Sequence, residues 1–84
     1  MQLKLVKNAI GKNTGNAAQH YLLIRLAALA ESDDVVRWGI TDMAELTGMH
    51  YATVRKHIKD LERQGHLTIK RIKAGQPVNI QLNL

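Results

Sequence analysis

The chain contains no cysteine and no phenylalanine, and it has one tryptophan and one proline. The absence of cysteine excludes disulfide bonds and thiolate chemistry, and it agrees with a reducing compartment. Because aromatic side chains are scarce, we predict a core built from Leu, Ile, Val, Ala and Met. The apolar runs at residues 21–24 and 26–30 are far shorter than a membrane span and are separated by Arg25. The N-terminal residues also lack the apolar segment of a signal peptide, so a cytoplasmic location is expected.

Enzymatic and metal sites are not indicated. With 84 residues, the chain supports one small domain and leaves little room for a catalytic cleft. The Gly- and Lys-containing string at residues 11–16 lacks the residue order of a phosphate-binding loop. Four histidines have no metal-ligand spacing, so we expect surface or phosphate-contacting roles for His20, His50, His57 and His66. We therefore expect no enzyme activity, no metal and no cofactor.

The basic residues are distributed unevenly. The formal net charge is +5, yet residues 16–49 contain two basic against five acidic residues. Residues 50–84 contain seven basic against two acidic residues. Such a concentration of positive charge in one part of a small domain favours a polyanionic partner.

The first 31 residues divide into an arm and a helix. Alternation of Leu3 and Leu5 with polar residues is a weak strand signal, so residues 1–15 are expected to form an added edge strand or a basic tail. The domain proper is expected at residues 16–84. Asn16 is a suitable N-cap, and Gln19 three residues later completes a capping-box pattern. The helix that follows should run to about Glu31 and bury one face, consisting of Ala18, Leu22, Leu23, Leu26, Leu29 and Ala30.

Residues 40–64 contain two helical patterns joined by a tight turn. Val35 begins a short β-prone run, and Thr41 is expected to cap the first of these helices. Gly48 follows that helix, where a turn needs a residue that tolerates positive φ. The second helix, about residues 51–64, has a narrow apolar stripe formed by Val54, Ile58 and Leu61. Its opposite face is predicted to carry Ala52, Lys56, Lys59 and Arg63, with Arg55 on the flank.

The remaining residues predict a β-hairpin. Gly65 is placed to end the helix, and residues 67–72 form a strand pattern. A turn at residues 73–76 precedes Pro77 and a run at 78–84 in which apolar and polar residues alternate. Two such strands with a short glycine-containing turn between them are typical of a hairpin.

The order of these elements resembles a winged helix-turn-helix domain. The string L-T-G-M-H-Y-A-T-V-R-K-H-I-K-D-L-E-R-Q-G-H-L is similar to the motif of bacterial and phage winged-helix DNA-binding domains, including GntR-type repressors and phage replication initiators. The resemblance implies an α+β fold with three helices, a short strand before the second helix and a C-terminal hairpin wing. It also implies that the Thr53 hydroxyl contacts a DNA phosphate, that Val54 lies in the core, and that Arg55 and Lys56 reach phosphates or base edges.

One position departs from the family pattern. The recognition helix of such domains usually begins with Ser, Thr or Asp, and this chain has His50 there. Imidazole is a poorer cap than a hydroxyl or carboxylate. Either Thr47 or solvent compensates, or His50 is retained because it touches DNA.

We expect sequence-specific binding to double-stranded DNA, in transcription regulation or in phage or plasmid replication initiation. Arg55 is expected either to recognise guanine with two hydrogen bonds or to contact a phosphate without base information. The alternative function is a winged-helix protein-interaction module. Tight site-specific binding is expected to need a homodimer or a tethered protein partner, with strand pairing through the Leu82–Leu84 end or the Leu3–Leu5 arm. The residues expected to contact DNA are His50, Tyr51, Ala52, Thr53, Arg55, Lys56, Lys59, Lys70, Arg71, Lys73 and Gln76.

Overall fold

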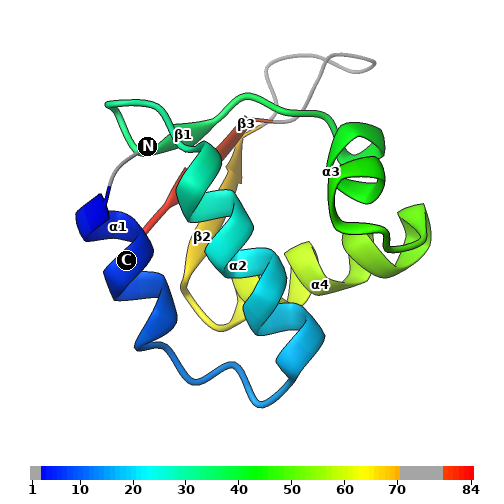
Figure 1. Ribbon diagram of the computed structural model, residues 1–84, viewed down its shortest axis with the longest axis horizontal. Helices are drawn as coiled ribbons and strands as arrows, with labels where there is room; N and C mark the ends of the chain where they lie inside the picture. The colour runs from blue at the N-terminus through cyan, green and yellow to red at the C-terminus, as the bar shows by residue number, and fades with distance from the viewer. Residues whose placement is uncertain (1–2, 71–78) are drawn as a thin grey trace.

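Helix α2 (Ala17–Leu29) lies in the middle of the molecule, and the other elements surround it (Figure 1). The computed structural model describes residues 3–70 and 79–84. Before α2 stands α1 (Leu3–Ile10), and after it come β1 (Val35–Val36), α3 (Ile40–Thr47) and α4 (Tyr51–Arg63). The strands β2 (Leu67–Lys70) and β3 (Asn79–Leu82) complete the order. The described residues thus form an α+β fold with four helices and a C-terminal antiparallel hairpin.

The three strands form one antiparallel sheet in the order β1–β3–β2. Strand β3 is central: Ile80 is paired with Val36 on one side and with Ile69 on the other. The alternation predicted for the last strand is confirmed, because Ile80 and Leu82 are buried whereas Asn79 and Gln81 are half-buried. The predicted turn at residues 73–76, and with it Arg71, lies outside the described residues.

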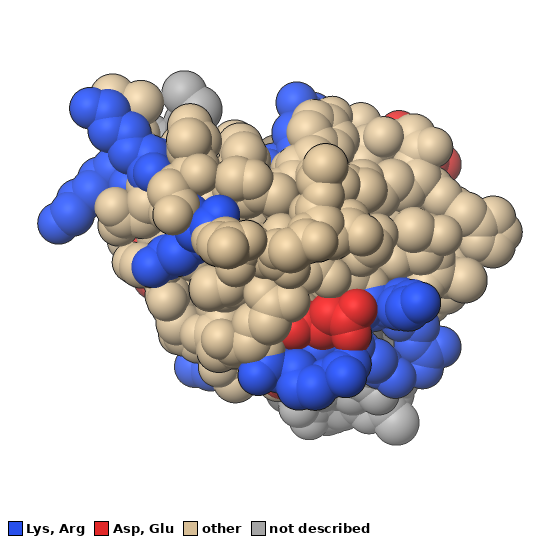
Figure 2. Space-filling view, turned by 90° about the horizontal axis from the view of Figure 1, so that it is seen from below, with Lys and Arg blue, Asp and Glu red and all other residues tan. Residues whose placement is uncertain are grey.

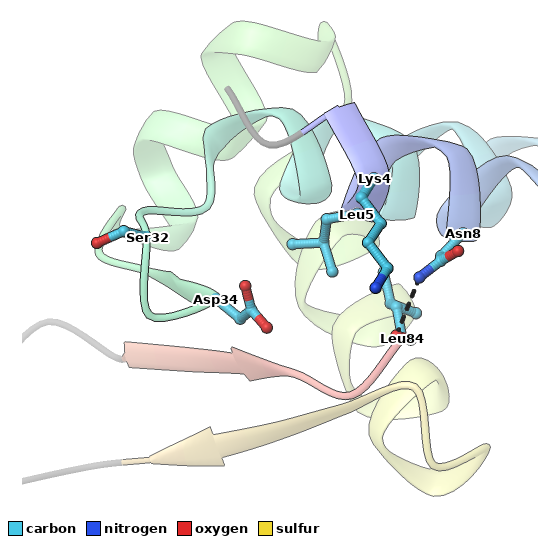
Figure 3. A pocket seen from close by; sticks show the side chains of 6 residues that line it. All are labelled: Lys4, Leu5, Asn8, Ser32, Asp34 and Leu84. Carbon is cyan, nitrogen blue, oxygen red and sulfur yellow. Dashed lines mark hydrogen bonds between the residues drawn. The ribbon is translucent and has the colours of Figure 1, made fainter.

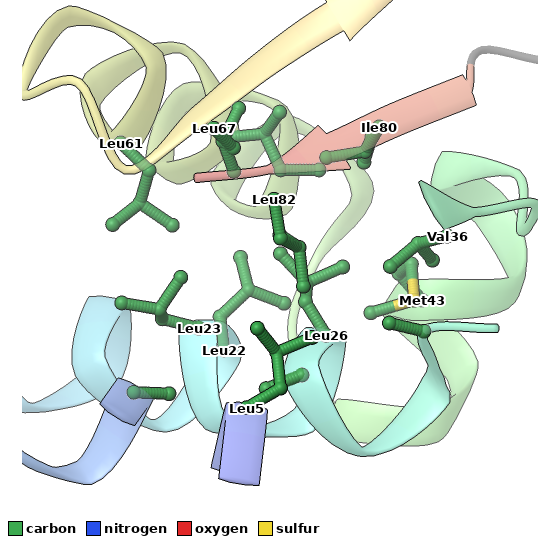
Figure 4. Close-up of a cluster of buried hydrophobic side chains, with 14 of the residues drawn as sticks. Leu5, Leu22, Leu23, Leu26, Val36, Met43, Leu61, Leu67, Ile80 and Leu82 are labelled. Carbon is green, nitrogen blue, oxygen red and sulfur yellow. The ribbon is translucent and has the colours of Figure 1, made fainter. Parts of the chain in front are cut away.

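The core is aliphatic, as predicted. Leucines of α2 point toward side chains of the sheet, and residues of α1, α3 and α4 close the cluster at its sides (Figure 4). Among the described residues, the large side chains that are fully buried include Leu22, Leu23, Leu26, Val36, Met43, Val54, Ile58, Leu61, Leu67 and Ile80. Each such side chain stabilises the fold by roughly 1.5–3 kcal/mol relative to an exposed position. This burial fixes α4 with its apolar side against α2 and the sheet.

Residues 3–10 form a helix, so the prediction of an edge strand was wrong, as was the count of three helices. Leu5 and Ala9, four residues apart, share one helical face and are buried against α2. His20 on α2 donates a hydrogen bond from Nε2 to the carbonyl oxygen of Ala9 at 2.8 Å. The alternation of Leu3 with Leu5 was misleading because Leu3 is 60% exposed. The sequence pattern that matches the observed packing is the helical spacing of Leu5 and Ala9.

Two further sequence predictions fail at the ends of the core. Leu82 lies on the central strand and is 3% exposed, so the proposed pairing of an exposed Leu82–Leu84 end is wrong for that residue. Ala18 is exposed, because the first inward-facing residue of α2 is Gln19. Helix α2 ends at Leu29, close to the predicted end near Glu31, and Ala30 has extended backbone angles.

The sequence predicted a capping box with two reciprocal hydrogen bonds at the start of α2, and one of these two bonds is present. The side chain of Asn16 accepts a hydrogen bond from the backbone N–H of Gln19 at 2.9 Å, which confirms Asn16 as the cap. The reciprocal bond of a capping box is absent, because the Gln19 side chain points to α4 instead. None of the helices in residues 3–70 and 79–84 is long and apolar enough to cross a membrane.

Candidate nucleic-acid interface

Helices α3 and α4 are joined by a short turn that local hydrogen bonds hold in place. Gly48 adopts φ 73°, the left-handed conformation that the sequence predicted, and its N–H bonds to the carbonyl of Ala44 at 2.9 Å. The Thr47 hydroxyl donates to the carbonyl of Met43 at 2.8 Å and accepts from the N–H of Met49 at 3.3 Å. The predicted N-cap at Thr41 is wrong: Gly39 occupies that position and makes no side-chain cap.

His50 itself caps α4. Its Nδ1 accepts a hydrogen bond from the backbone N–H of Ala52 at 3.1 Å, and its backbone is extended, as an N-cap requires. Thr47 therefore does not compensate for an absent cap. Because Nδ1 accepts, the neutral ring carries its proton on Nε2. The exposed imidazole thus presents a donor to the outside while it stabilises the helix start.

Helix α4 has one buried and one exposed face, as predicted. Val54, Ile58 and Leu61 are at most 1% exposed. The exposed residues are Tyr51, Ala52, Thr53, Arg55, Lys56, Lys59, Glu62 and Arg63. Four of these, Ala52, Lys56, Lys59 and Arg63, form the centre of the exposed face by helical spacing, and we call them the α4 face. Arg55 and Glu62, seven residues apart, share one flank of it.

His57 was predicted to be a surface or phosphate-contacting residue, and this is wrong because its side chain is only 9% exposed. It lies within the apolar stripe, three residues after Val54 and four before Leu61. That spacing is the signal by which its burial was predictable. His20 and His66 are half-buried, and His50 alone of the four is exposed.

The charges of α4 are largely unneutralised. Within the described part of the chain, Arg63 forms an ion pair with Asp60, whereas Arg55, Lys56 and Lys59 form none. Seen from below, basic side chains gather along one border of the molecule with acidic side chains among them, and a broad uncharged surface separates them from a second basic group (Figure 2). Unpaired lysine and arginine on a rigid helix suit an anionic partner.

Strand β2 continues this basic surface. Lys70 is exposed at the end of β2, and β2 packs beside α4. The Glu62 carboxylate accepts a hydrogen bond from the N–H of Ile69 at 2.9 Å, which ties the helix to the strand. Lys70 follows directly after the residue whose backbone this bond ties to α4. Arg71, Lys73 and Gln76 lie outside the described residues.

Other charged groups are engaged elsewhere. Arg37 contacts Asp33 at 2.6 Å and Glu31 at 3.0 Å. The hydrogen bonds from Arg37 lower the pKa of Asp33, and the same contacts raise the pKa of Arg37. At the α4–β2 turn, burial and the nearby charge of Lys12 lower the pKa of His66. Both effects disfavour the charged imidazolium form of His66.

A hollow of about 370 Å³ lies between α1, the turn before β1 and Leu84 (Figure 3). Lys4 and Asn8 point toward Leu84, and Asn8 Nδ2 donates to the Leu84 carbonyl at 3.3 Å. No residue of the predicted DNA contact lines this hollow. Among the described residues, no three His, Asp or Glu side chains gather to hold a metal ion. The α4 face and Lys70 are therefore the strongest candidate site.

Comparisons with family models, with curated proteins and with solved structures gave no match to this chain.

Proposed function

We propose that this protein is a winged helix-turn-helix domain that binds double-stranded DNA with sequence preference. Helices α3 and α4 would form the helix-turn-helix, and the β2–β3 hairpin would form the wing. The observation that carries the proposal is the division of α4, which has Val54, Ile58 and Leu61 in the core and the unpaired cations Lys56 and Lys59 in solvent. A helix with this division fits the major groove of B-DNA, which admits a helix and is lined by phosphates.

The start of α4 is the part assigned to base recognition. In helix-turn-helix proteins the N-terminal residues of the second helix approach the base edges most closely. We assign this role to Tyr51, Ala52, Arg55 and Lys56, all of which are exposed. Phosphate contacts are assigned to Lys59 and Lys70, to the Thr53 hydroxyl and to the Nε2 donor of His50. Arg71, Lys73 and Gln76 would contact the backbone or the minor groove from the wing.

The cellular role that fits this site is transcription regulation or replication initiation in a phage or plasmid system. The proposed activity needs no cofactor, no catalytic residue and no small-molecule ligand. A single winged helix contacts few base pairs, so tight binding would require a homodimer or a tethered partner on adjacent half-sites. The alternative is that the α4 face binds an acidic protein in place of DNA. The experiment has to distinguish these two functions.

The deciding experiment measures affinity for duplex DNA as a function of salt concentration. If α4 and Lys70 neutralise phosphates, log affinity falls linearly with log salt, with a slope of about −0.9 for each phosphate contacted. For Lys59, Lys70 and the two wing cations Arg71 and Lys73 we expect a slope of about −3 to −4. The absence of binding to any duplex at about 50 mM salt would contradict the proposal and favour the protein-interaction role.

The role of Arg55 is tested by selecting binding sites from random duplex DNA with the wild type and with Arg55→Ala and Lys56→Ala. Loss of base preference at one position of the selected site assigns the substituted residue to base recognition. Uniform weakening across all sequences assigns it to a phosphate. Either result is compatible with DNA binding, and the two results separate the alternatives that the sequence leaves open for Arg55.

Replacing Glu62 by Gln is expected to increase duplex affinity by about threefold to tenfold at low salt. The substitution removes a negative charge from the flank of α4 that also carries Arg55, but it retains an oxygen that accepts from the Ile69 N–H. Fluorescence anisotropy with a labelled duplex measures the change. The matched control is Glu31→Gln, which alters the net charge equally but lies beside Arg37. An equal gain in both variants would show that net charge, and not the flank of α4, determines the affinity.

A further inference from the structure

A buried amide connects the first turn of α2 to one side of α4. Gln19 is 4% exposed, although glutamine usually lies at the surface. Its Nε2 lies 3.3 Å from Nδ1 of His57 and 3.4 Å from Oδ2 of Asp60. Its Oε1 accepts a hydrogen bond from Nε2 of Gln64 at 2.8 Å. Both hydrogens of the amide nitrogen and its oxygen are therefore engaged with α4 or its C-cap.

The three partners of Gln19 lie on one side of α4. His57, Asp60 and Gln64 stand at positions i, i+3 and i+7, which places them one above another along the helix. Asp60 is held in turn by the ion pair with Arg63, and Gln64 also donates to the carbonyl of Thr14 at 3.4 Å. The amide of Gln19 is thus positioned against most of the C-terminal half of α4.

These hydrogen bonds restrict the rotation of α4 about its own axis, which apolar packing alone does not. Contacts of Val54, Ile58 and Leu61 with the core are non-directional and tolerate small rotations of a helix about its axis. Hydrogen bonds are directional, and breaking one here would leave a buried polar group unsatisfied. A rotation of about 20° moves a side-chain tip at 6 Å from the helix axis by roughly 2 Å. This displacement exceeds the tolerance of a hydrogen bond to a base edge.

We propose that Gln19 is a positioning residue that fixes the rotation of α4 about its own axis and thereby determines which base edges Arg55 and Lys56 reach. The inference rests on the proposed function, because it concerns how accurately the DNA-binding helix is presented. Gln19 contacts no DNA in this scheme. It acts through His57, Asp60 and Gln64.

The test uses Gln19→Met, which keeps the length and shape of the side chain and removes every hydrogen bond of its amide. The control is His20→Ala on the same helix turn, which removes the bond to Ala9 on α1 and leaves the contacts of α4 intact. For each variant, affinity is measured for the duplex obtained by selection with the wild type and for an unrelated duplex, at a temperature where urea unfolding shows the variant folded.

We expect Gln19→Met to lose about tenfold in affinity for the selected duplex and less than threefold for the unrelated one. Non-specific binding depends on total positive charge, which the substitution does not alter. Partial unfolding would weaken binding to both duplexes equally, so the ratio of the two affinities reports positioning and not stability. His20→Ala is expected to leave this ratio unchanged. A wild-type ratio in folded Gln19→Met would overturn the inference.

Two further measurements separate the remaining outcomes. If Gln19→Met does not fold, Gln64→Ala removes the exposed end of the network, and an unchanged affinity ratio in that variant rejects the inference. If the wild type prefers no sequence, the proposed function fails. Residual dipolar couplings of α4 and α2 then decide the positioning role by themselves. The same relative orientation of the two helices in wild type and Gln19→Met rejects it, and an altered orientation supports it.

Discussion

Replacing Lys56 and Lys59 together by glutamate is expected to lower the affinity for duplex DNA by at least about 100-fold at 0.1 M salt. Both side chains are exposed at the centre of the α4 face, and within the described residues neither has a carboxylate partner. The substitution removes two attractive contacts and introduces two repulsive ones next to phosphates. The unfolding free energy should change by less than about 0.5 kcal/mol, because exposed positions of this kind contribute little. Anisotropy titration and urea unfolding measure the two quantities.

The matched control reverses Lys4 and Lys7 on α1. These lysines are also exposed, and the reversal alters the net charge by the same amount on a helix that packs against α2. We expect it to weaken binding by less than about tenfold, through long-range attraction that salt screens. Equal losses in the two double variants would mean that DNA senses only the overall charge. That result would contradict the assignment of α4 as the DNA-binding helix.

The features that the sequence predicted correctly are those that depend on neighbouring residues. Asn16 accepts from an amide three residues away, so its identity suffices to predict the helix start. Gly48 has a backbone conformation that other residues adopt only with strain. The stripe of Val54, Ile58 and Leu61 and the alternation in β3 follow from the periodicity of helix and strand. The same helical periodicity also predicts the exposed cationic face of α4.

Two features that the sequence did not predict, the helix at residues 3–10 and the role of Gln19, depend on distant partners. Residues 3–10 are compatible with either a strand or a helix, and contact with α2 decides for the helix through burial of Leu5 and Ala9. Gln19 appeared to be half of a capping box, yet its amide is used by residues 38–45 positions later in the chain. A short-range rule assigns Gln19 to the nearest unsatisfied backbone group. In the folded chain, the Gln19 amide instead forms hydrogen bonds with the side chains of His57, Asp60 and Gln64.

Replacing Leu26 by alanine is expected to lower the unfolding free energy by about 3–4 kcal/mol. Leu26 is fully buried in α2, in the cluster that α1, α4 and the sheet share (Figure 4). Removing its side chain loses the transfer free energy of the buried atoms and leaves a cavity in a core that has no aromatic side chain to fill it. For a domain of this size the loss corresponds to a decrease in Tm of roughly 12–32 °C. Calorimetry or thermal denaturation followed by circular dichroism measures it.

The control for Leu26→Ala is Leu3→Ala, because Leu3 is 60% exposed and undergoes the same chemical change. Its substitution should cost less than about 0.5 kcal/mol, and a comparable loss at both positions would contradict the described core. The core variant and the charge-reversal variant also constrain each other. Leu26→Ala leaves the α4 face intact, so saturating duplex DNA should recover part of its Tm by binding the folded state. The Lys56 and Lys59 double variant should keep its Tm without DNA and gain little when DNA is added.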